Sequence, residues 1–183
     1  MSLAFLRDRL PARREMLLVF ALCFTLVYGW SMLTFFNYLP GWMMYLNGWD
    51  ILGLFAYNQV FALLESAAVF ALLLLLSALL PAALLRRSFL PLGSVMLVLA
   101  AAAAVFLHFW GQVPLWPSKT LILGLLAYLA AVGAAWAAFR RFDGLGRAIE
   151  AFLNRVVLLM YLYLPLVAVG VALVVVRNLM GVF

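Results

Sequence analysis

Charged residues are scarce in this chain of 183 residues, and long apolar runs separate the few that it has. Only 10% of the residues are charged, whereas 70% are hydrophobic. A water-soluble domain of this size could not bury so much apolar surface, but the hydrocarbon of a bilayer accommodates it. We therefore expect an all-α, polytopic integral membrane protein in which residues 1–183 form a single transmembrane domain.

Cysteine and histidine are almost absent, which removes several classes of site. Cys23 is the one cysteine and His108 the one histidine. A disulfide within the chain, a CxxC redox or zinc motif and a bis-histidine haem site within one copy are therefore excluded. The sequence also lacks the zinc-protease, nucleophile-elbow and phosphate-loop motifs. We predict no metal and no cofactor, and an enzymatic role is disfavoured though left open.

Five apolar runs are long enough to cross about 30 Å of hydrocarbon at 1.5 Å per residue. Backbone groups in lipid must pair within their own segment, so each run is predicted to be a helix. The predicted spans cover residues 16–36, 57–80, 89–110, 120–139 and 156–176.

The basic residues predict how the chain threads the membrane. All of them except Lys119 and Arg177 precede the first span or lie between spans two and three or four and five. Short cytoplasmic loops carry such an excess of arginine and lysine. We therefore expect a cytoplasmic N-terminus and an outer C-terminus, in a membrane such as the bacterial cytoplasmic one. The net charge of +6 sits at helix ends, so no nucleic-acid partner is expected.

Two segments are predicted to lie along the membrane surface. Residues 143–155 repeat apolar side chains at helical spacing and fit a short amphipathic helix on the inner face. Residues 38–56 lack basic side chains and are expected at the outer interface, where aromatic rings are favoured. Asp50 is expected to be the N-cap of the second spanning helix. The aromatic residues of the outer segment are Tyr38, Trp42, Tyr45, Trp49 and Phe55.

The fourth span is rich in small residues at four-residue spacing. One row is Ala127, Ala131 and Ala135, and a second row of alanines begins at Ala130. Such rows let helix backbones approach closely, so we expect this helix to be central and to pack on the third span. Internal packing is the favoured interpretation, and a dimerisation face is the alternative.

Polar side chains gather at the predicted outer ends of the spans, and Glu65 is the most informative of them. It lies several residues inside the second span, where an ionised carboxylate is costly unless it is paired or protonated. Asn58 shares its helix face, because the two residues are seven positions apart. The sequence predicts an outward-facing polar pocket, or alternatively a merely structural polar contact. The candidate pocket residues are Glu65, His108, Asn58, Arg177 and Gln112.

Two functions remain open from the sequence. The favoured one is an accessory or interaction subunit that binds another membrane protein, or a second copy, within the lipid bilayer. The alternative is a small membrane enzyme or transporter that handles a lipid or amphipathic substrate at the outer leaflet. In that alternative, Arg177 or Lys119 would engage a phosphate.

Overall fold

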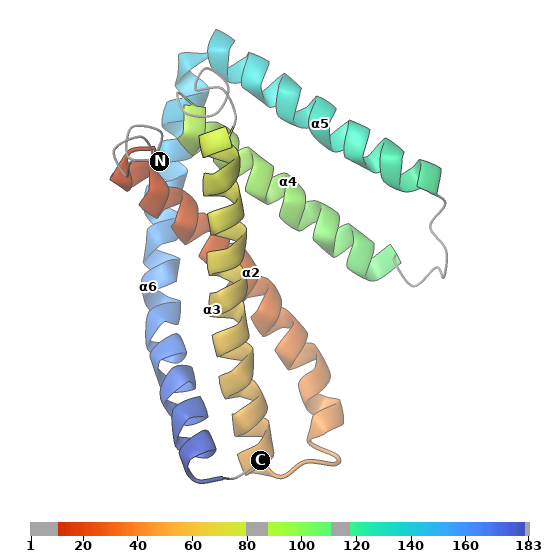
Figure 1. The fold of residues 1–183 in the computed structure, drawn as a ribbon, viewed down its shortest axis with the longest axis vertical. Coiled ribbons are helices and arrows are strands. Elements are labelled where there is room, and N and C mark those ends of the chain that lie inside the picture. Colours follow the sequence, from red (N-terminus) through yellow and green to blue (C-terminus); the bar gives the residue numbers. More distant parts are fainter. Residues whose placement is uncertain (1–10, 80–87, 111–117, 182–183) are drawn as a thin grey trace. The chain divides into compact units, whose positions relative to one another are not determined.

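A computed structural model describes residues 11–79, 88–110 and 118–181, which form five long α-helices (Figure 1). All five are long and apolar enough to cross a membrane, as the sequence predicts. The chain is thus an all-helical protein of the multi-pass membrane type. The helices are α2 (Arg13–Trp42), α3 (Gly48–Leu79), α4 (Phe89–Trp110), α5 (Ser118–Arg141) and α6 (Asp143–Leu179).

Local signals in the sequence set the boundary between α2 and α3. Pro40 lies in the last turn of α2, two residues before that helix ends, and it has no N–H to donate. The side-chain Oδ1 of Asn47 accepts a hydrogen bond from the backbone N–H of Asp50 at 2.9 Å. Asn47 is therefore the N-cap, and the expectation that Asp50 caps α3 is wrong, because the helix begins one turn earlier.

Three helices, α2, α3 and α6, are considerably longer than the predicted spans. α6 contains 37 residues, or about 55 Å of helix, and it includes residues 143–155 together with the fifth apolar run. Part of α6 must therefore extend beyond a hydrocarbon layer of about 30 Å. The outer segment is largely helical as well, since α2 continues to Trp42 and α3 starts at Gly48. The interfacial positions of both segments stay predictions.

The chain divides into two compact units, and the first comprises Met1–Val19 with Leu73–Leu153. Within it, α4 and α5 pack together, and the Tyr128 hydroxyl donates to the carbonyl of Met96 at 3.1 Å. This contact confirms the predicted pairing of the third and fourth spans. No residue in the apolar window of α5 is buried, however. The expectation that α5 is central is wrong. Ala127 and Ala131 of its first row are exposed, whereas Ala135 is half-buried.

The second unit comprises Phe20–Leu72 with Asn154–Phe183 and contains parts of α2, α3 and α6 (Figure 1). Its core includes Phe24 and Tyr28 from α2, Ala62 from α3 and Val167 from α6. Phe20 contacts Phe70, and Phe35 contacts Phe55. The later a residue lies on α2, the earlier its partner lies on α3. The two helices are therefore antiparallel.

α6 also runs antiparallel to α3. Its side chains that face the rest of the unit recur every three or four residues, the spacing expected for one packed face of a helix. The pairing brings the C-terminal end of α6 beside the N-terminal end of α3. Helices α2 and α6 are consequently parallel to each other. The residues of the packed face of α6 in this unit are Val156, Met160, Tyr163, Val167, Gly170, Val174 and Arg177.

Candidate functional site

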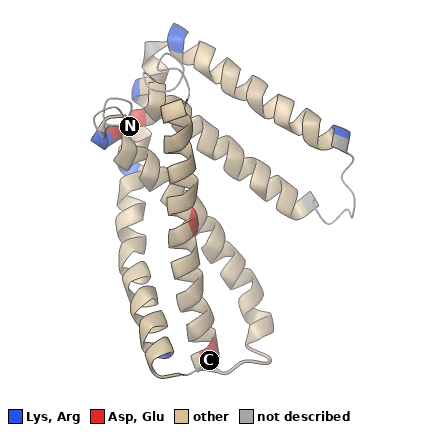
Figure 2. Cartoon of the chain, in the orientation of Figure 1, with Lys and Arg blue, Asp and Glu red and all other residues tan. Residues whose placement is uncertain are grey.

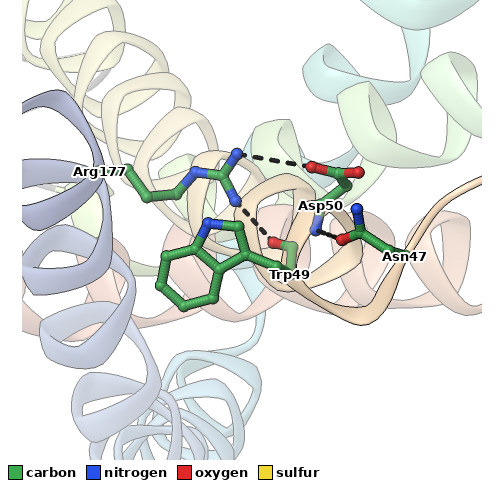
Figure 3. A network of polar contacts seen from close by, with 4 residues as sticks. All are labelled: Asn47, Trp49, Asp50 and Arg177. Atoms are coloured by element: carbon green, nitrogen blue, oxygen red, sulfur yellow. Dashed lines mark hydrogen bonds and ion pairs between the residues drawn. The ribbon is translucent and has the colours of Figure 1, made fainter. Parts of the chain in front are cut away.

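Arg177 lies at the end of α6 and joins it to the first turn of α3 (Figure 3). Its Nη1 donates a hydrogen bond of 2.6 Å to the backbone carbonyl of Trp49, and its Nη2 lies 3.9 Å from Oδ1 of Asp50. The guanidinium carbon lies 5.3 Å from the centre of the Trp49 ring. A charge-assisted hydrogen bond and a cation–π contact thus hold the two helix ends together.

The guanidinium of Arg177 is nearly closed off from its surroundings. Its side chain is only 8% exposed, and it lies over Gly53, where a Cβ would come within 2.5 Å of Cζ. A side chain at position 53 would require the guanidinium to shift. Nε of Arg177 is buried and has no hydrogen-bond partner within the described part of the chain. The group is therefore built into the α3–α6 contact and is poorly placed to receive a ligand from outside.

Gln59 is a buried polar residue that the predicted pocket did not include. It is 0% exposed on α3, and its backbone carbonyl accepts a hydrogen bond of 2.7 Å from the Tyr28 hydroxyl. Its Oε1 is buried without a hydrogen-bond partner in the described chain. Gly170 of α6 packs directly on its side chain. A polar residue within the apolar run 57–80 was the available signal, but the sequence alone does not show that Gly170 packs on it.

Asn58 occupies a different environment from the adjacent Gln59. Its side chain is half-buried, and its Nδ2 donates a long hydrogen bond of 3.5 Å to the backbone carbonyl of Ser31 on α2. This contact belongs to the α2–α3 pairing. The structure does not bring Asn58 into contact with Arg177, which binds Trp49 and Asp50 instead.

Glu65 lies near the middle of α3, separated from Gly48 by about 25 Å of helix and from Leu79 by about 20 Å. Figure 2 shows acidic residues at the start of this helix and part-way along it. The Glu65 side chain is exposed. It makes no hydrogen bond or ion pair with the residues described, although it is within electrostatic reach of the buried Cys23. An exposed acid in the middle of an apolar helix is the outstanding chemical feature of this unit.

The remaining predicted pocket residues belong elsewhere in the chain. His108 is exposed on α4 in the first unit, with its ring 5.5 Å from that of Phe109 in an edge-on arrangement. Gln112 lies outside the described residues. The meeting of Glu65 with His108 stays a prediction, since the two residues belong to different units.

The described residues contain no group of three histidine, cysteine or acidic side chains that would hold a metal ion. The polar contacts of Arg177 and Gln59 join helices to one another: Arg177 links α6 to α3, and Gln59 links α3 to α2. A lone exposed carboxylate such as that of Glu65 is costly in lipid unless it is paired.

No protein-family model, curated protein or solved structure shows a significant match to this chain.

Proposed function

We propose that this protein is an accessory or interaction subunit of a membrane complex. The observation that carries the proposal is Glu65, exposed near the middle of α3 without a bonding partner among the described residues. A charged side chain at the centre of a spanning helix costs about 3 kcal/mol on insertion scales, and such residues usually pair within an assembly. Binding to another membrane protein would remove this cost.

The surface of α5 also supports an interaction role. Its apolar window contains no buried residue, and the first two alanines of each row are exposed, namely Ala127, Ala131, Ala130 and Ala134. Small residues in such rows are typical of close contacts between spanning helices. A protein whose small-residue helix is exposed has room for a further helix to pack there.

The burial and hydrogen bonding of Arg177 disfavour the alternative of a lipid-handling enzyme or transporter. In that alternative its guanidinium would bind a phosphate at the outer leaflet. Instead the side chain is 92% covered and donates to the carbonyl of Trp49 at 2.6 Å. A phosphate would have to displace this bond and open the α3–α6 contact, so a structural role for Arg177 fits better.

We further propose that the N-terminus is cytoplasmic and the C-terminus outside, in the inner membrane of a bacterium. The support is the distribution of basic residues, of which only Lys119 and Arg177 fall on the outer side in this orientation. The parallel directions of α2 and α6 fit five alternating spans, which would place the two termini on opposite sides of the membrane. In this orientation residues 38–56 lie at the outer interface and residues 143–155 at the inner one.

The test is the composition of the particle extracted from native membranes in mild detergent. The expected result is a particle heavier than 20.4 kDa plus detergent, containing a second membrane protein in a fixed ratio. An unrelated multi-pass protein tagged in the same way and extracted in the same detergent is the control. A particle containing this chain alone would overturn the proposed role.

A further inference from the structure

Glu65 belongs to a row of exposed side chains along one side of α3. Phe61 is 65% exposed and Leu72 is 58% exposed, and Glu65 and Ala68 between them are exposed too. The four residues are spaced by four, three and four positions, so they form one straight face of the helix. We call these four residues the Glu65 face.

We propose that the Glu65 face binds a spanning helix of another protein that carries a lysine or arginine at the depth of Glu65. This inference rests on the proposed accessory role and names the chemistry of the partner. A cation on the docked helix would pair with the carboxylate in a medium that contains no water to solvate it. Phe61 and Leu72 would supply apolar contacts on either side of the ion pair.

The described part of this chain has no basic residue at the level of Glu65 within the second unit. Gly170 packs on Gln59 and the two helices are antiparallel, so Glu65 lies level with about residue 164 of α6. Arg155 is then about 13 Å away along the helix axis, and Arg177 is about 20 Å away in the opposite direction. Arg177 is also held by Trp49. Neither side chain is placed to neutralise Glu65.

A second copy of this chain is a poor occupant of the same face. A symmetric contact through the Glu65 face would bring two carboxylates together, and like charges in a low-dielectric medium repel strongly. Lipid hydrocarbon alone would supply no cation to pair with the carboxylate. A spanning helix with a basic residue would pair with Glu65 and pack on the apolar side chains of the Glu65 face. The small side chain of Ala68 lets the backbone of that helix come close.

The inference is tested by cross-linking in the native membrane. Phe61 is replaced by the photoreactive residue p-benzoylphenylalanine, and the cross-linked peptide is sequenced by mass spectrometry. Leu162 on α6, which is 65% exposed, is replaced in the same way as the matched control. The expected result at position 61 is a cross-link to an apolar peptide of another protein that contains a lysine or arginine.

The role of the charge is then tested with Glu65→Gln. We expect the yield of the cross-link from position 61 to fall about fivefold or more, because an interhelical polar contact is lost. Leu64→Gln, which adds an amide at a neighbouring exposed position, should leave the yield unchanged. Exchanging the charges, with Glu65→Lys here and an acid at the basic position of the partner, should restore it. An unaltered melting temperature of the extracted Glu65→Gln protein shows that its fold is intact.

Several outcomes would overturn the inference. They are a cross-link to a peptide without a basic residue, a cross-link only to a second copy, no protein cross-link at position 61, or a yield that Glu65→Gln leaves unchanged. A loss of stability shared equally by Glu65→Gln and His108→Gln in the isolated chain would also overturn it, since Glu65 would then be paired internally. If the extracted particle contains a second protein that cross-links only from other positions, the accessory role stands and this site is wrong.

Discussion

Gly170 of α6 packs directly on Gln59 of α3 in the second unit. A Cβ atom at position 170 would lie 2.7 Å from the Cβ of Gln59 and 3.3 Å from the carbonyl oxygen of Ala56. The first distance is too short for a real contact of a Cβ atom, and the second is tighter than most such contacts. The two helices therefore approach each other as closely as they do because position 170 has no side chain.

Gly170→Ala is expected to destabilise the α3–α6 contact. The added methyl group must push against the base of a fully buried side chain and against backbone, so we expect a loss of about 1–3 kcal/mol in the free energy of unfolding. Thermal unfolding in detergent measures it. Gly124→Ala is the control, because nothing lies within 4 Å of the new atom there. Equal melting temperatures for both variants would contradict the close packing at Gly170.

Arg177→Met should weaken the link between the end of α6 and the start of α3. It removes the 2.6 Å bond to the Trp49 carbonyl, and hydrogen bonds to charged groups contribute about 1.5–3 kcal/mol. Asp50→Asn is the matched comparison: its oxygen is 3.9 Å from Nη2 and its side chain is 40% exposed, so its loss should cost under about 0.5 kcal/mol. Chemical unfolding of both variants gives the two values. A larger effect from Asp50→Asn would show that the ion pair, not the carbonyl bond, dominates.

Tyr28→Phe removes a buried hydrogen bond without changing the shape of the core. The hydroxyl donates to the Gln59 carbonyl at 2.7 Å, and the Tyr28 side chain is 0% exposed. Interhelical hydrogen bonds in membrane proteins contribute about 0.6 kcal/mol on average. We expect a loss of that order in unfolding experiments. Tyr161→Phe, at a position that is 61% exposed, should have no measurable effect. If Tyr28→Phe left the free energy of unfolding unchanged, this hydrogen bond would contribute nothing to stability.

The orientation of the chain can be measured with a membrane-impermeant maleimide on intact cells. Cys23 is 1% exposed, so the unaltered protein should react little and provides the background. Tyr45→Cys, at an 85% exposed position between α2 and α3, should be labelled from outside. Ala148→Cys near the start of α6 should react only after the membrane is permeabilised. Labelling with the opposite preference would reverse the proposed topology.

The prediction of five spanning helices succeeds because it rests on local properties of the chain. Each apolar run must satisfy its own backbone in lipid, so hydropathy alone predicts a helix. Helix ends are harder, as the region of Asn47 and Asp50 shows: both are good capping residues, and only the position of the first turn decides between them. The pairing of α4 with α5 was also predictable, because a short connection favours neighbours.

The candidate site depended on tertiary structure to a much greater degree. The sequence marks Glu65 as an unusual residue and Arg177 as an outer charge. It does not distinguish residues that line a pocket from residues that pack between two helices. The structure buries Arg177 against Trp49 and Gly53 and leaves Glu65 exposed. These outcomes depend on how α3 and α6 are rotated about their axes. The close approach of Gly170 to Gln59 is one of the contacts that fit this rotation.

The sequence by itself thus determines that this protein belongs in a membrane, how many helices are able to cross it and where its charges lie along the chain. Only the tertiary structure decides which polar groups are bonded inside the protein and which are left exposed. The reason is physical: transfer into lipid is a sum over the residues of one segment. Contact between helices depends on the shapes of residues that are more than a hundred positions apart in the chain, such as Gln59 and Gly170.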